Sequence, residues 1–146
     1  MNIKLMLDPE DPIRKNLEEI GIRDDPDSSY ILMRQGSGVN YIPGRRGDLQ
    51  FYIDVHEIIF IESMGHDILI HTGDGVYNSN ERLKSFEQIL PADLFLRVSN
   101  SSIVNMKKIK RIESSIMQKF ILHMTDASRV DVTRSYYYIF KDRIGI

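Results

Sequence analysis

Residues 97–112, RVSNSSIVNMKKIKRI, gather the side chains of this sequence that are best suited to bind a polyanion. Arginine and asparagine can bond bidentately to guanine and adenine edges, and serine, lysine and backbone amides suit phosphate. The apolar pair Ile103 and Val104 between them is predicted to be core, and Asn105 is predicted to serve structure at a strand end. The polar and cationic residues of the stretch that could serve this purpose are Arg97, Ser99, Asn100, Ser101, Ser102, Lys107, Lys108, Lys110 and Arg111.

Charge is distributed unevenly along the chain. Residues 97–146 hold ten cations and four acids, a net +6, whereas residues 1–96 hold nine cations and seventeen acids, a net −8. Such asymmetry favours a C-terminal surface that binds a polyanion. Lysines placed at strand edges to prevent aggregation would produce the same excess of cations. Charge alone does not separate the two interpretations.

Catalytic chemistry finds little support. GSGVNY lacks the third glycine of a dinucleotide motif, and no Walker-type Gly-Lys-Ser/Thr occurs. His66 and His71 are the closest histidines in the sequence. A spacing of five residues on a strand would point their side chains to opposite faces. Glu62 and Asp67 could bind magnesium, although acids at strand ends usually face solvent. We therefore expect no enzyme activity, no catalytic residue, no metal site, no cofactor and no small-molecule substrate.

Length and composition indicate one domain with a short appendage. The chain has 146 residues, 42% of them hydrophobic, and lacks cysteine, so it has neither disulfides nor a thiol nucleophile. No window approaches 18 apolar residues, and the apolar N-terminal run is too short for a signal peptide. We expect a cytoplasmic protein.

The predicted elements are mostly strands. The appendage, residues 1–48, reads as a strand at 3–7, a helix at 11–21, a strand at 29–34 and a loop or loose hairpin at 35–48. The main domain, residues 49–146, reads as strands and short extended segments at 50–53, 57–62, 67–72, 75–78, 95–98, 102–105, 109–114, 119–124 and 128–132. Turn signals at 72–75 and 125–128 predict two hairpins, and residues 133–144 could form a short helix.

Two helices have predicted ends. In the first, Asp11 is the expected N-cap, Pro12 the first residue and Gly21 the terminator. The second covers 79–91 and places the apolar side chains of Leu83, Phe86 and Leu90 on one face. Ser79 or Asn80 is its expected N-cap, and Pro91 is expected to end it.

From about residue 50 to the end, the chain resembles the LytTR family of bacterial DNA-binding domains. EIIFIESMGHDILIHTGDGVY is similar to the opening strands of the family. ERLKSFEQILPADLFLRVSNSSIVNMKKIKRI is similar to its helix, its Leu-Pro stop, its Phe-x-Arg and its Ser-x-Ile-Val-Asn signature. DVTRSYYYIFKDRI is similar to its terminal Val-Ser/Thr-Arg-x-Tyr.

The resemblance implies an elongated, mostly β fold with one or two short helices, whose loops enter DNA major grooves. It implies that His66, Asn100 and Arg134 touch DNA, with Arg97 and Ser101 beside them at the backbone. Lysines and arginines at 107–111 would add charge for counterion release. Asn100 could instead satisfy a turn, and Arg134 could cap a helix or pair with Asp131.

Two departures from the family pattern concern the target sequence rather than the fold. Many family members have histidine or another ring where this chain has Ser99 and Ser102, and an aromatic residue common before the third strand is replaced by GHDI.

The appendage is shorter than the roughly 100 residues of a receiver domain, so aspartate phosphorylation is not expected. The layout resembles stand-alone LytTR regulators, some of which act beside a membrane protein that restrains them. We expect the acidic appendage to mediate dimerisation or docking of such a membrane-protein inhibitor.

These observations predict a sequence-specific transcription regulator that binds repeated half-sites on double-stranded DNA as a homodimer. The alternative is a protein-interaction module of the same fold that pairs with or antagonises another regulator and binds no DNA.

Overall fold

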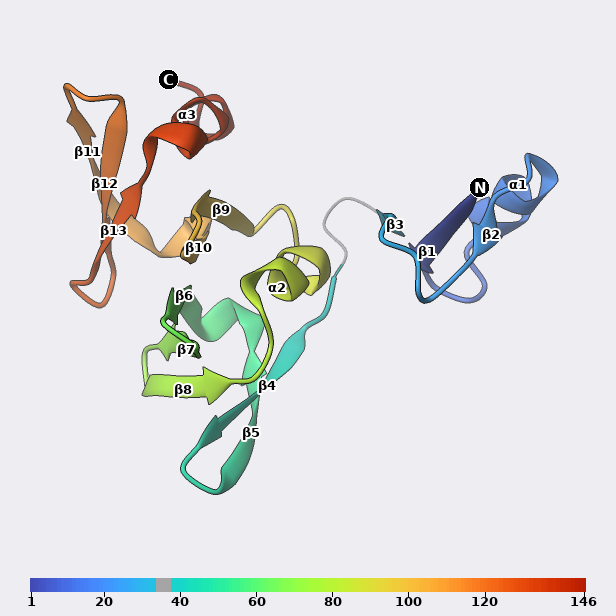
Figure 1. Ribbon diagram of the computed structural model, residues 1–146, viewed down its shortest axis with the longest axis horizontal. Coiled ribbons are helices and arrows are strands. Elements are labelled where there is room, and N and C mark those ends of the chain that lie inside the picture. Colours follow the sequence, from blue (N-terminus) through green and yellow to red (C-terminus); the bar gives the residue numbers. More distant parts are fainter. Residues whose placement is uncertain (34–37) are drawn as a thin grey trace. The chain divides into compact units, whose positions relative to one another are not determined.

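The computed structural model describes residues 1–33 and 38–146. The chain forms two compact units, Met1–Gly38 and Val39–Ile146 (Figure 1). The fold is mostly β with short helices, as predicted. No helix within these described ranges is long and apolar enough to cross a membrane.

The first unit is a small parallel sheet with one helix. Its elements are β1 (Asn2–Met6), α1 (Ile13–Glu19), β2 (Arg23–Asp24) and β3 (Ile31–Met33), and the strand order is β2-β1-β3. Leu5 of β1 and Leu17 of α1 are buried. The Asp24 carboxylate accepts a hydrogen bond from the Leu5 backbone N–H at 2.9 Å. That bond, with a smaller contribution from Arg14, lowers the pKa of Asp24.

The ends of α1 differ slightly from the prediction. Pro12 is the N-cap, although the Asp11 carboxylate does accept from the Ile13 backbone N–H at 3.1 Å. Gly21 follows the helix with φ of +87°, a conformation that favours glycine, and so terminates it as expected. Sequence analysis missed β2, which is only two residues long.

The second unit is built on a seven-stranded sheet with the order β5-β4-β8-β7-β6-β10-β9. Every pairing in it is antiparallel. The predicted β7–β8 hairpin is confirmed. The strands are β4 (Tyr41–Arg46), β5 (Leu49–Asp54), β6 (Ile58–Met64), β7 (Asp67–Thr72), β8 (Gly75–Ser79), β9 (Phe95–Ser99) and β10 (Ser102–Asn105).

The strand β4 explains why the chain divides after Gly38, whereas sequence analysis placed the boundary at Asp48. It pairs with β5 along its whole length, so residues 41–54 form a hairpin that belongs to the second unit. A hairpin was one of the two interpretations of residues 35–48, of which 35–37 lie outside the described residues, as does residue 34 of the predicted strand 29–34. The strand β4 is not evident from the sequence YIPGRR, because its Pro and Gly are depleted in strands.

A second sheet of three antiparallel strands follows, in the order β11-β12-β13. Its strands are β11 (Ile109–Ser115), β12 (Lys119–Met124) and β13 (Arg129–Val132), and the predicted β12–β13 hairpin is confirmed. The chain ends in a 3-10 turn (Arg134–Tyr136) and α3 (Tyr137–Ile144), so the predicted terminal helix exists.

Two hydrophobic cores hold these layers together. The first lies under α2 (Leu83–Ile89), whose Leu83 and Phe86 are buried together with Leu90 against the large sheet, as predicted. The second joins β9 and β10 to the small sheet and α3. There Phe140 packs at 5.2 Å from Phe120, measured between ring centroids, and Tyr137 stacks on Phe120 at 4.8 Å.

The predicted caps of α2 are wrong. Arg82 is its N-cap residue, because the two polar side chains upstream have other partners. Ser79 Oγ accepts from the Glu81 backbone N–H at 3.1 Å, and Asn80 Oδ1 accepts from the Arg45 guanidinium at 2.6 Å. The helix therefore starts later than its sequence pattern suggested.

Candidate nucleic-acid interface

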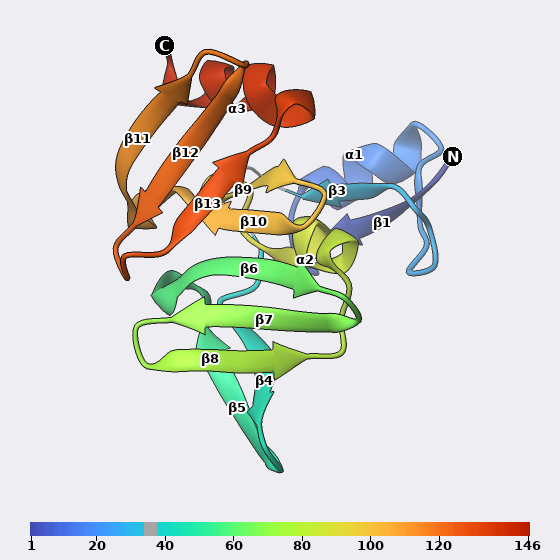
Figure 2. The ribbon, with the colours of Figure 1, turned by 60° about the vertical axis from the view of Figure 1, so that its left-hand side comes forward.

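Three connections meet at one end of the large sheet. They are the β6–β7 turn (65–66), the β9–β10 turn (100–101) and the segment 133–136 between β13 and α3. The Ser63 backbone N–H donates to the Ser101 carbonyl at 2.8 Å, and the Thr133 N–H donates to the Val98 carbonyl at 3.0 Å. Figure 2 shows all three connections on the right-hand side of the second unit. Segments far apart in sequence are thus joined through their backbones.

Each connection carries one of the side chains predicted to read bases: His66, Asn100 and Arg134, all of them exposed. Within the described residues, the His66 imidazole and the Arg134 guanidinium have no hydrogen bond or ion pair. The structure therefore shows neither the Asp131 ion pair nor the helix cap considered for Arg134. Both side chains have donors available to a ligand.

Arg97 holds the β9–β10 turn. Its Nε donates to the Ser99 carbonyl at 2.9 Å, and one terminal nitrogen donates to the Asn100 carbonyl at 2.7 Å. The other terminal nitrogen pairs with Glu87 at 2.7 Å, and the Arg97 side chain is only 19% exposed. The turn that presents Asn100 is thus fastened to α2 by a charge-assisted network.

Asn100 itself is held from a second side. Its Oδ1 accepts from the Tyr136 hydroxyl at 3.4 Å, a contact that links the β9–β10 turn to the segment before α3. The serines next to it close the turn in the manner proposed as the alternative. Ser99 Oγ accepts from the Ser101 backbone N–H at 3.1 Å, while Ser101 remains exposed.

The structural roles expected inside the stretch are confirmed. Ile103 and Val104 are 1% and 0% exposed. Asn105 is buried, donates to the Ile58 carbonyl at 2.8 Å and accepts from the Lys107 backbone N–H at 3.0 Å. It therefore caps the 3-10 turn Met106–Lys108 that ends β10.

Sequence analysis missed two cations of the interface. Arg82 and Lys84 are exposed and line one surface hollow with His66, Arg97 and Asn100. A signal was present, since cations at the start of a helix oppose the helix dipole and so need another reason to be there.

A second hollow lies on the other side of the β9–β10 turn. It is lined by Ser101 and Ser102 together with Thr133 and another cation that sequence analysis did not single out, Arg129. Arg129 is exposed at the start of β13. Glu62 and Asp131 also line this hollow, so its charge is mixed.

The run of cations at residues 107–111 does not lie at these turns. Lys107, Lys108, Lys110 and Arg111 follow the far end of β10, which at about 3.3 Å per residue places them more than about 13 Å from Asn100. Arg111 is in addition paired with Glu113 at 3.2 Å.

The remaining histidines have local partners. His71 pairs with Glu62 at 2.9 Å and stacks on Phe60 with ring centroids 4.0 Å apart. His56 donates its backbone N–H to Asp54 and places its ring nitrogen 2.9 Å from the same carboxylate, which lowers the pKa of Asp54. In the described part of the chain, no group of three or more His, Asp or Glu side chains could hold a metal ion.

Comparison with known proteins identifies relatives of the second unit in both sequence and fold. Residues 48–145 match the family model of the LytTr DNA-binding domain. The structure matches a solved LytTr DNA-binding domain from Bacillus cereus with a TM-score of 0.72 and 26% identity, over 75% of this chain and 100% of that one.

Curated relatives are longer. The chain is 32% identical over 102 residues to sensory transduction protein LytT of Enterococcus faecalis, covering 69% of this chain and 42% of that protein. It is 26% identical over 125 residues to transcriptional regulatory protein LytR of Staphylococcus aureus, covering 85% of this chain and 51% of that protein. The chain thus spans about half or less of the length of these relatives.

Proposed function

Because this chain belongs to the LytTR family of DNA-binding domains, we propose that it is a sequence-specific transcription regulator acting in the bacterial cytoplasm. Relatives named as transcriptional regulatory and sensory transduction proteins support this proposal. Its partner would be double-stranded DNA, read through turns in the major groove.

The observation that supports the proposal is that three exposed side chains, His66, Asn100 and Arg134, lie on connections joined by backbone hydrogen bonds. The Arg134 guanidinium has no partner among the residues that the structure describes, and its geometry suits guanine O6 and N7. The Asn100 amide suits adenine N6 and N7, and His66 can add a further contact. Ser101, Lys84, Arg82 and Arg129 surround them and suit phosphates.

In this proposal Arg97 acts mainly by positioning. All three of its guanidine nitrogens are engaged within the chain, two of them on carbonyls of the β9–β10 turn. Its net charge still adds to the field at the backbone, but breaking the network to reach a phosphate would release the turn that presents Asn100.

Selection from a random duplex pool tests the function. The full chain is incubated with the pool at near-physiological salt, and the retained duplexes are sequenced. We expect enrichment of a motif repeated about one helical turn apart, since we propose that the protein binds two half-sites as a homodimer. Recovery of no motif would contradict the proposal and favour a protein-interaction module of the same fold.

Lys84→Ala is expected to lower the salt dependence of DNA binding. Loss of one phosphate contact reduces the slope of log K against log salt by about 0.9. The matched control is Lys108→Ala, at the far end of β10, which we expect to leave the slope nearly unchanged. Fluorescence anisotropy over a salt series measures both. A larger change for Lys108→Ala would show that the cation run, and not the start of α2, lies along the DNA backbone.

We propose that the first unit mediates dimerisation or docks an inhibitor such as a membrane protein. Its sequence carries more acids than cations, and a three-stranded parallel sheet with a single helix is small to stand alone. Removing residues 1–38 is expected to shift the chain from dimer to monomer in sedimentation. If the shortened chain kept the oligomeric state of the full chain in sedimentation and bound the inhibitor equally well, both roles would be ruled out.

A further inference from the structure

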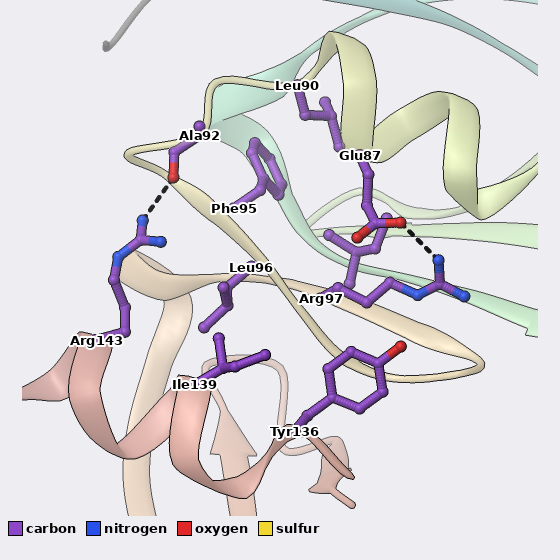
Figure 3. A pocket seen from close by; sticks show the side chains of 10 residues that line it. Glu87, Leu90, Ala92, Phe95, Leu96, Arg97, Tyr136, Ile139 and Arg143 are labelled. Carbon is purple, nitrogen blue, oxygen red and sulfur yellow. Dashed lines mark hydrogen bonds and ion pairs between the residues drawn. The ribbon is translucent and has the colours of Figure 1, made fainter. Parts of the chain in front are cut away.

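A largely apolar cavity of about 250 Å³ lies between α2, β9 and α3, and the proposed function leaves it unused (Figure 3). Its apolar wall is formed by Leu90, Phe95, Leu96, Ile103 and Ile139. An engineered cavity of about 150 Å³ holds benzene, so this space can take one ring with a short chain. The size suits a small ligand.

The polar side chains at the two ends of the cavity favour an anion. In Figure 3, Arg143 and Ala92 lie at one end and the Glu87–Arg97 pair at the other. Glu87 is neutralised by Arg97 at 2.7 Å. One terminal nitrogen of Arg143 donates to the Ala92 carbonyl at 2.7 Å, and its other N–H groups have no partner in the described part of the chain. Among the described residues that line the cavity, a carboxylate would therefore find a cation without an acidic partner, whereas an ammonium group would find no free acid.

The cavity is coupled to the DNA-reading turn through two of its own lining residues. Arg97 holds the carbonyls of Ser99 and Asn100, and the Tyr136 hydroxyl donates to the Asn100 side chain. Both side chains border the cavity. A molecule that fills the space therefore contacts the two side chains that position Asn100.

We propose that this cavity binds a small amphiphilic carboxylate, its apolar part against Leu96 and Ile139 and its head group on Arg143. Occupancy shifts Arg97 and Tyr136 and weakens DNA binding. The regulatory part of this inference rests on the proposed function, whereas the binding part does not.

The probe is 4-phenylbutyrate, with 4-phenylbutyramide as its neutral counterpart. In ¹H–¹⁵N NMR of the full chain without DNA, we expect the carboxylate to shift the amide signals of Arg97, Asn100 and Ile139. The amide should bind about tenfold more weakly, the value of one charge-assisted contact. Saturating carboxylate should raise the Kd for the selected duplex severalfold.

Two variants and a control make the test specific. Ile139→Trp fills the cavity and should abolish the shifts, and Arg143→Gln should reduce affinity to that of the neutral amide. Lys141→Gln removes a cation from the same helix outside the cavity, and should retain wild-type probe binding and DNA binding. Well-dispersed spectra establish that each variant is folded.

The opposing outcomes are distinct. Absence of shifts at millimolar probe, or equal affinity of carboxylate and amide, would overturn the site. Saturation that leaves the Kd for DNA unchanged would overturn the regulation. If the protein selects no DNA at all, the proposed function fails, while the NMR experiment still decides whether the cavity binds its ligand.

Discussion

Arg134→Ala is expected to weaken binding to the selected duplex by about 1–3 kcal/mol and to relax sequence preference at one position of each half-site. The guanidinium is exposed and has no partner within the described residues, so its removal leaves no buried charge behind. The whole loss should therefore come from contacts to DNA. Fluorescence anisotropy with the selected duplex and with a scrambled duplex measures the difference.

The matched control for Arg134→Ala is Arg111→Ala, which changes an exposed arginine of β11. Both variants lose one positive charge, so a purely electrostatic effect would be similar in the two. We expect Arg111→Ala to weaken specific and scrambled duplexes alike and only slightly. Equal losses on both duplexes for Arg134→Ala would mean that Arg134 contacts phosphate and reads no base.

Phe140→Ala is expected to lower the free energy of unfolding of the second unit by about 3–5 kcal/mol. Phe140 is 0% exposed and packs on Phe120 in the core that joins the small sheet and α3 to the large sheet. The substitution leaves a cavity where a ring had been. Hydrogen exchange of the buried β12 amides reports this free energy directly.

The same substitution has a functional consequence. The helix α3 follows directly on the segment 133–136, which carries Arg134 and the Tyr136 hydroxyl that holds Asn100. Loosening α3 should therefore weaken specific DNA binding even where the protein remains folded. Tyr138→Ala, on the exposed face of the same helix at 64% exposure, should change both quantities much less. A similar loss of stability for Tyr138→Ala would show that α3 is not held by its buried face.

Local patterns were sufficient for most of the elements. Alternating residues such as DILIHT and KFILHM match β7 and β12 residue for residue, because a two-residue period with a turn signal on each side leaves few other structures. The core positions of Ile103 and Val104 and the structural role of Asn105 at the strand end were likewise predictable, since an apolar pair here stands between polar residues. The motifs also sufficed to identify the family, which the match over residues 48–145 confirms.

Other features depended on contacts between distant segments. Ser79 and Asn80 looked like helix caps, but Glu81 and the distant Arg45 take up their oxygens. The sequence YIPGRR became a strand because β5 and β8 offered it partners, against its own weak propensity.

The candidate interface shows most clearly what depends on local sequence and what depends on contacts between distant segments. Its residue types were visible in the sequence, and runs of cations drew attention to Lys107–Arg111. Only the antiparallel pairing of β10 with β6 and β9, and the bond from Thr133 to Val98, bring the connections that carry His66, Asn100 and Arg134 to one end of the sheet. The same pairing leaves Lys107–Arg111 beyond the opposite end of β10. Residue spacing along a chain reports on one strand or helix, whereas a binding surface is set by which strands pair and in which register.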